Sequence, residues 1–388
     1  MVSWLFRGGG LSCKSQKAYL YLQNHGLVNV KLKWVKDKAL DAAVAGQRDL
    51  KAACILVSVI SSDSECHVPI YRLRRYRGQL GLPDEVKLST FVRRYPSIFH
   101  ESSFLDSGGT PVPLFSLTPE ALNLHQEEIQ FFKHNRIDIV TRLQKLLMLM
   151  RDTTLPLHTI DQLKWDLGLP YDYYQSLIPP FPDIFSVVKL EDDRVGLKLL
   201  SWDSGLAVSH LQKNSSSQQN EGVSGDCLAF PIGFPRGFGL KKKCMKWLEE
   251  WQTLPYTSPY VDASHLDPRT DVSEKRIVGA FHELLHLTIQ KQTERKNVSN
   301  LRKPLCLPQK FTKVFERHPT IFYISKKNDT QTVVLRDAYS GSELIEKHPL
   351  VEIRRKYIEV MKQGFLDRSR GLYREARDMK LEQEQESQ

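Results

Sequence analysis

The residues whose types and spacing best suit chemistry are His282, Glu283 and His286, within the pattern HELLH. On a helix this spacing places two imidazoles one turn apart, where they can bind zinc, and the glutamate can then act as the general base of a metalloprotease. A zinc site of this kind needs a third protein ligand. The downstream candidates are Glu294, which follows His286 by only eight residues, and Glu316 and His318, which lie inside another predicted helix.

An internal comparison gives HELLH a simpler interpretation. With an offset of 138 residues, HELLH aligns with Gln144–Met148, which reads QKLLM and has the pattern of an ordinary amphipathic helix. The apolar residues around HELLH continue the same stripe, and the histidines flank it. We therefore interpret the motif as part of a structural helix and predict no catalytic residue, no metal site and no cofactor. The sequence also lacks a phosphate-binding loop and a dinucleotide fingerprint.

Basic residues form three clusters, and aromatic residues interleave them. Lysine and arginine neutralise phosphates, and aromatic rings stack on unpaired bases, which is how single-stranded RNA is held. In the second cluster the interleaved aromatic residues are Phe234, Phe238, Trp247 and Trp251. The alternative is that the charges form solvated faces and the aromatic residues belong to the core. The predicted RNA-binding residues are Arg72, Arg74, Arg75, Arg77, Arg93, Arg94, Arg236, Lys241, Lys242, Lys243, Lys246, Lys310, Lys313 and Arg317.

A pattern that occurs three times predicts the elements that position these clusters. Each copy has a Leu-Pro pair, a short amphipathic segment, a Pro-x-Ile-Phe sequence and two apolar runs, and the copies open at Leu82, Leu169 and Leu307. We read each copy as helix, helix, turn, helix and two-stranded hairpin, the order of a winged helix-turn-helix. The expected fold is mainly α with small β-hairpins (α+β), in tandem winged-helix-like repeats. The third helix of the second copy has no Lys or Arg, so we expect that copy to serve packing.

Composition bounds the remaining possibilities. A formal charge of +10 and a pI near 9.2 favour a polyanionic partner, and the six cysteines show no CxxC pair. No apolar run of 18 residues is present, so we expect no membrane span. The acid-free basic start predicts an organelle transit peptide at residues 1–30, with a basic nucleic-acid-binding arm as the alternative. Residues 208–227 are rich in Ser, Gln and Asn and predict a disordered insertion, and residues 362–388 predict a charged tail.

Several long blocks also resemble one known family. They are KLKWVKDKALD from Lys31, FVRRYPSIF from Phe91, GFPRGFGLKKK from Gly233, VGAFHELLHLTIQKQTERKNVSNLRK from Val278, LPQKFTKVFERHPTIFYIS from Leu307 and LIEKHPLVEIRRKYIEVM from Leu344. In this order they resemble the plant organelle RNA recognition (PORR) domain family, and in particular its mitochondrial What's-this-factor group. The resemblance spans residues 31–361, which the insertion divides into 31–207 and 228–361. It implies an organelle-targeted RNA-binding factor for splicing group II introns.

From this reasoning we predict a non-enzymatic RNA-binding protein of the mitochondrion, with the chloroplast as the alternative location. Its partners would be organelle intron RNA and other splicing factors, and no membrane. Two other functions remain open on the residues alone. One is a zinc metalloprotease that uses His282, Glu283 and His286, and the other is a DNA-binding organelle transcription factor, since winged helices more often read duplex DNA.

Overall fold

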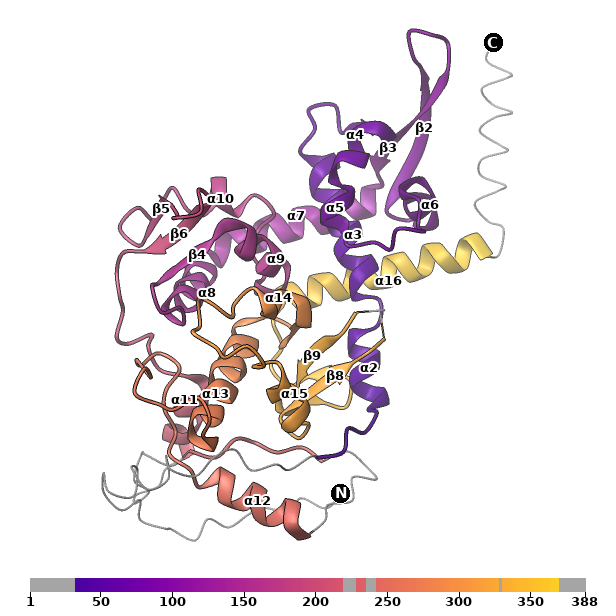
Figure 1. Cartoon of the computed structure of the whole chain (residues 1–388). Helices are drawn as coiled ribbons and strands as arrows, with labels where there is room; N and C mark the ends of the chain where they lie inside the picture. The colour runs from indigo at the N-terminus through magenta and orange to yellow at the C-terminus, as the bar shows by residue number, and fades with distance from the viewer. Residues whose placement is uncertain (1–31, 219–227, 235–241, 328–329, 370–388) are drawn as a thin grey trace. The chain divides into compact units, whose positions relative to one another are not determined.

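Short helices and small antiparallel sheets alternate along the described chain, which comprises residues 32–218, 228–234, 242–327 and 330–369 of a computed structural model (Figure 1). The predicted class, mainly α with small β-hairpins, is confirmed. The chain divides into two compact units, which we describe separately. Unit 1 contains Met1–Ala43, Val140–Leu167 and Tyr174–Ile345, and unit 2 contains Val44–Ile139, Gly168–Tyr173 and Glu346–Gln388.

Unit 2 holds the first copy of the sequence pattern. Its elements are α3 (Gln47–Ser61), β1 (His67–Pro69), α4 (Ile70–Leu73), η1 (Arg74–Tyr76), α5 (Arg77–Leu80), α6 (Leu88–Arg94), β2 (Phe99–Leu105), β3 (Pro111–Leu117), α7 (Pro119–His134) and α16 (Pro349–Ser369). The strands form a three-stranded antiparallel sheet in the order β1-β3-β2. Leu50, Leu56, Phe91, Phe115 and Tyr357 are fully buried and form the centre of its core.

Unit 1 holds the third copy and most of the second, whose Gly168–Tyr173 segment belongs to unit 2. The second has α8 (Arg136–Met148, which begins in unit 2), β4 (Thr154–Pro156), α9 (Leu157–Leu167), α10 (Tyr173–Ser176), β5 (Phe185–Lys189) and β6 (Val195–Leu199). The third has α13 (Asp271–Leu287), β7 (Gln292–Glu294), α14 (Arg295–Ser299), α15 (Lys313–Arg317), β8 (Phe322–Ser325) and β9 (Thr332–Leu335). The other elements are α2 (Lys38–Val44, which ends in unit 2), α11 (His210–Gln218), α12 (Lys242–Gln252), η2 (Arg336–Ala338), β10 (Tyr339–Ser340) and β11 (Glu343–Leu344).

The three larger sheets share one strand order, β1-β3-β2, β4-β6-β5 and β7-β9-β8, with all neighbours antiparallel. The two-stranded hairpin predicted for each copy was incomplete, because a third strand of three residues pairs with the last hairpin strand in every case. Such a strand is too short to show a period of two in sequence, and its backbone pairs with one neighbouring strand. In the third sheet every residue of β8 and β9 is buried, and the hairpin lies beside α15 (Figure 1).

Local chemistry accounts for several helix ends. Thr118 caps α7, because its hydroxyl accepts a hydrogen bond from the Ala121 amide at 3.2 Å. Helices α2 and α3 are separated at Gly46, whose φ of 78° is a left-handed conformation that glycine adopts at little cost. Residues 83–86 form one turn, extended Lys87 follows, and α6 begins at Leu88.

The predicted disordered insertion at residues 208–227 contains a helix instead. Helix α11 covers His210–Gln218, and its Leu211 side chain is only 5% exposed. The His210 amide also donates a hydrogen bond to Glu283 Oε2 at 2.6 Å. The burial of Leu211 and this hydrogen bond explain why a largely polar sequence forms a helix here. Residues 219–227, the predicted transit peptide at 1–30 and the tail beyond residue 369 lie outside the described residues. Among the residues that are described, no helix is both long and apolar enough to cross a lipid bilayer.

Candidate nucleic-acid interface

Helix α12 separates its charges from its aromatic residues. Lys242, Lys243 and Lys246 are exposed, whereas Trp247 and Trp251 are 4% and 1% exposed. The lysines can therefore reach a phosphate backbone, but the two tryptophans cannot stack on bases as the sequence predicted. They pack instead on His318, with ring centroids 5.6 and 4.4 Å away.

The alternation of types along α12 explains this division. Trp247, Leu248 and Trp251 recur at spacings that place them on one face of a helix, and the lysines lie outside that stripe. A buried cation fixes the end of the helix. The Lys275 ammonium group donates hydrogen bonds to the carbonyl oxygens of Gln252 and Leu254 at 2.8 and 2.6 Å. Positive charge is favourable at the carboxyl end of a helix, where carbonyls lack partners.

Two further residues of the second cluster, Arg236 and Lys241, lie outside the described residues, as does Phe238. Phe234 is described and is 43% exposed. Of the aromatic residues predicted to stack on RNA bases, it is therefore the one that the described structure leaves accessible. Arg236 and Lys241 stay predictions.

The third cluster splits in the same way. Lys310 and Lys313 are exposed, but Arg317 is part of a buried ion-pair network. Its Nε donates to Glu274 Oε1 at 2.9 Å, and its Nη2 lies 3.6 Å from Asp271. The guanidinium also lies over the Trp247 ring. Arg317 is thus held by contacts within the fold, and we therefore remove it from the candidate interface.

His318 completes that network. Its Nε2 lies 2.7 Å from Glu274 Oε1, and both side chains are buried. Burial raises the pKa of the Glu274 carboxyl, but the hydrogen bonds and charges of His318 and Arg317 outweigh it, so that the net pKa is below its ordinary value. The network joins α13 to the end of α15 and to α12.

The first cluster belongs to unit 2, and its arginines differ in how much the fold uses them. Arg74 and Arg75 are exposed on η1. Arg72 is exposed but pairs with Asp63 at 3.0 Å. Arg77 is partly buried and donates to the Pro83 carbonyl. Arg74 and Arg75 are thus the arginines of this cluster that are exposed and have no ion pair among the described residues.

The two arginines at the end of α6 are ion-paired within unit 2. Arg93 makes a bidentate contact with Glu101, at 2.8 and 2.6 Å, and this contact raises its pKa. Arg94 lies 3.6 Å from Asp49. Bidentate contacts fix the guanidinium in one orientation, so RNA would have to compete with a carboxylate for Arg93.

The HELLH helix is α13, and its glutamate is not free to act as a base. Glu283 is 1% exposed, and its Oε1 accepts a hydrogen bond from the Tyr260 hydroxyl at 2.6 Å. The same oxygen lies 2.7 Å from the Lys145 ammonium, and Oε2 accepts from the His210 amide. Lys145 is the residue that the 138-residue offset aligns with Glu283, so the two matching helices meet through these side chains. A zincin-type general base needs a carboxylate that faces a metal-bound water.

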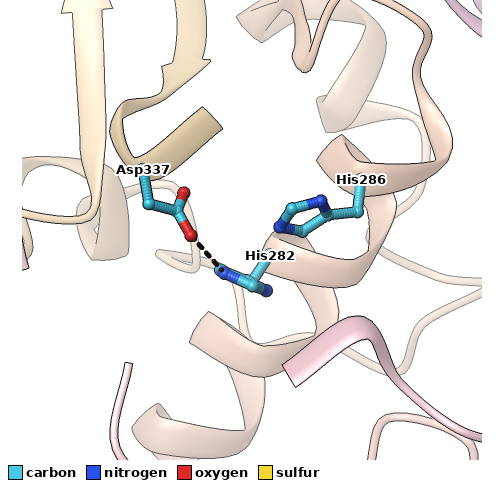
Figure 2. Close-up of side chains that lie close together, drawn as sticks. All are labelled: His282, His286 and Asp337. Carbon is cyan, nitrogen blue, oxygen red and sulfur yellow. Dashed lines mark hydrogen bonds and ion pairs between the residues drawn. The ribbon is translucent and has the colours of Figure 1, made fainter. Parts of the chain in front are cut away.

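The two histidines of the motif face a third side chain from another element. His282 and His286 lie one turn apart on α13, and Asp337 of η2 lies opposite them (Figure 2). His282 Nε2 is 3.3 Å from Asp337 Oδ2. His286 stacks on His210, with ring centroids 3.5 Å apart. Burial, followed by the charges of His282 and His210, lowers the pKa of His286 far below its ordinary value.

Sequence reasoning missed Asp337 and His210 in this group. Asp337 lies 55 residues after His282 and follows a buried strand, while His210 lies in the segment predicted to be disordered. Neither position has a local pattern that points to α13. Only the packing of the β7-β9-β8 sheet and of α11 against that helix brings these residues together.

Comparisons with known proteins identify the family. The profile of the family described as "Plant organelle RNA recognition domain" matches residues 35–366. Protein WHAT'S THIS FACTOR 9, mitochondrial, from Arabidopsis thaliana is 38% identical over 351 residues, covering 89% of this chain and 88% of that protein. Protein WHAT'S THIS FACTOR 1, chloroplastic, from Zea mays is 30% identical over 328 residues, covering 83% of this chain and 65% of that protein.

A third relative is Protein ROOT PRIMORDIUM DEFECTIVE 1 from Arabidopsis thaliana, which is 27% identical over 339 residues, covering 84% of this chain and 82% of that protein. No solved structure matches the chain. The family profile matches far more than half of the sequence and includes α12, α13 and the three sheets. The chain therefore belongs to the plant organelle RNA recognition domain family.

Proposed function

We propose that this protein binds intron RNA in the plant mitochondrion and promotes the splicing of group II introns. It holds the RNA on exposed lysines and arginines, and the intron supplies the chemistry of splicing. Other splicing factors join it on the same RNA. The family's RNA recognition and the name of the mitochondrial relative support the partner and the location.

The proposal rests on a set of exposed lysines that form no ion pair within the described part of the chain. Lys242, Lys243, Lys310 and Lys313 are exposed, and none of them has a carboxylate within ion-pair distance in the described part of the chain. Helices α12 and α15, which bear Lys242, Lys243 and Lys313, meet where Arg317 lies over Trp247. Lys310 lies in the turn just before α15. Unpaired cations on adjacent helices can displace the counterions of a phosphate backbone.

An RNA-binding titration tests this assignment. We expect the double substitution Lys242→Gln and Lys243→Gln to weaken binding of intron RNA and to flatten the dependence of log K on log salt by about 1.4, since each lost contact to a single strand removes about 0.7. The same relation gives a loss of roughly 25-fold at 0.1 M salt. Lys198→Gln is the matched control, because Lys198 is an exposed lysine of unit 1 on β6, in the copy whose third helix has no basic residue.

Two results would count against the proposal. Unchanged affinity and slope in the double variant would remove α12 from the interface. An equal loss of RNA affinity in the Lys198→Gln control would mean that any positive charge on the protein contributes to binding. In that case these lysines would not define an interface. Competition with duplex DNA in the same buffer addresses the transcription-factor alternative, since preference for the duplex would favour it.

A further inference from the structure

A group of two histidines and one aspartate in unit 1 has the composition of a metal site. His282 and His286 project from the same face of α13, and Asp337 reaches them from η2, which directly follows β9 (Figure 2). One candidate ligand atom from each side chain can be chosen so that all three lie within 4.8 Å of one another. Imidazole nitrogen and carboxylate oxygen are both ligands that zinc accepts.

Three polar atoms of this group have no hydrogen-bond partner among the described residues. His282 is only 2% exposed. Both ring nitrogens of His286 and Oδ1 of Asp337 are buried and have no hydrogen-bond partner among the described residues. Buried polar atoms in proteins nearly always have a partner, and exceptions point to a missing water or ion. The stacked ring of His210 covers one side of His286, so water from that side does not reach it.

The spacing is close to that of a zinc site. Ligand atoms about 2.1 Å from a tetrahedral ion lie about 3.4 Å from one another. The 3.3 Å between His282 Nε2 and Asp337 Oδ2 already matches this spacing. One nitrogen of His286 lies within 4.8 Å of a ligand atom of each of the other two residues, so tetrahedral spacing would require it to approach by no more than about 1.4 Å. The proton on His282 Nε2 would move to Nδ1, leaving Nε2 as the ligand.

We propose that His282, His286 and Asp337 bind one Zn²⁺ ion, with water as the fourth ligand. The ion has a structural role. It fastens the turn after β9 to α13 and thereby holds the third sheet against its helix. The site is not that of a protease, because Glu283 is held by Tyr260, Lys145 and the His210 amide. The positive charge of Lys145 is balanced by Glu283 and does not oppose the ion.

Metal analysis of the full chain, with any histidine tag removed, tests the proposal. After dialysis against Zn²⁺ and then metal-free buffer, we expect about one zinc per wild-type chain and background zinc in His286→Ala and Asp337→Asn. The substitution of Asp337 by asparagine keeps the size of the side chain and an acceptor for His282 but removes the charge. His265→Ala is the control, because His265 is an exposed histidine of the same unit and its loss should not change the zinc content.

Two further measurements keep the result clear even where a variant folds poorly. Co²⁺ added to the metal-free wild-type protein should give the visible absorption of a tetrahedral site, and one equivalent of Zn²⁺ should abolish it. A chelator should lower the wild-type melting temperature and leave that of His286→Ala unchanged. Background zinc in the wild-type protein, or zinc that His265→Ala removes as fully as His286→Ala, would overturn the proposal.

Discussion

Lys313 and Arg317 lie one turn apart on α15, and the structure gives them opposite roles. Lys313 is exposed, whereas the Arg317 side chain is 19% exposed and is paired with Glu274, which is 8% exposed. Arg317→Gln removes one charged hydrogen bond of 2.9 Å and a longer contact to Asp271. A hydrogen bond to a charged group contributes about 1.5–3 kcal/mol to the free energy of unfolding.

That loss of unfolding free energy corresponds to a measurable decrease in the melting temperature. For a folded body of about 150–250 residues, a loss of about 1 kcal/mol lowers the melting temperature by about 2–4 °C. We therefore expect Arg317→Gln to lower the melting temperature of the transition that contains unit 1 by about 3–12 °C. Lys313→Gln removes only a surface charge, which changes stability by about 0.5 kcal/mol or less.

Two assays on the same preparations separate the roles. Calorimetry gives the melting temperature, and an RNA titration at two salt concentrations gives affinity and its salt slope. Lys313→Gln should weaken RNA binding and flatten the slope by about 0.7 while the melting temperature is unchanged. Arg317→Gln should keep the wild-type slope at a temperature where it is folded. If Arg317→Gln melts like the wild-type protein and loses as much slope as Lys313→Gln, the assignment of Arg317 to the fold is refuted.

Two more predictions concern packing and pH. Gly364→Ala should destabilise unit 2 by about 1–3 kcal/mol, because a Cβ at this position of α16 would collide with Ser97. The Ser97 hydroxyl already donates a hydrogen bond to the Val360 carbonyl at 2.7 Å. Equal midpoints of urea unfolding for the two proteins would contradict this prediction. The pKa of Glu274 is lower in the folded chain than its ordinary value of 4.5. Its contribution to stability is therefore fully present above that value and is lost as pH falls through the lower, folded pKa. The difference in unfolding free energy between wild type and Glu274→Gln should accordingly shrink when measured below pH 4.5, and a difference that grows there would refute the sign.

The local elements could be predicted because their causes are local. Thr118 and Pro119 mark the start of α7, and the apolar spacing around Trp247 gives α12 one buried face. The third strand of each sheet could not be predicted, since three residues have no periodicity and become a strand only beside a longer neighbour. Helix α11 was missed for a similar reason. The core that buries Leu211 and the Glu283 carboxylate that accepts from His210 are formed by residues far from α11 in sequence.

The candidate interface shows the same limit. Sequence reasoning located the basic clusters but could not tell Lys313 from Arg317, or an exposed ring from Trp247, because charge and aromaticity are properties of a residue and exposure is a property of the fold. Ion pairs such as Arg93 with Glu101 join residues on different elements, so no spacing rule finds them.

By itself, the sequence determined the class of fold, the positions of most helices, the basic clusters and the resemblance to an RNA-recognition family. Periodicity, composition and motif order are local properties of the chain and do not depend on how it folds. Tertiary structure decided which cations are exposed and which are paired within the fold. It also turned a histidine pair interpreted as ordinary helix packing into a group of three, because Asp337 reaches His282 only after the third sheet packs against α13 (Figure 2).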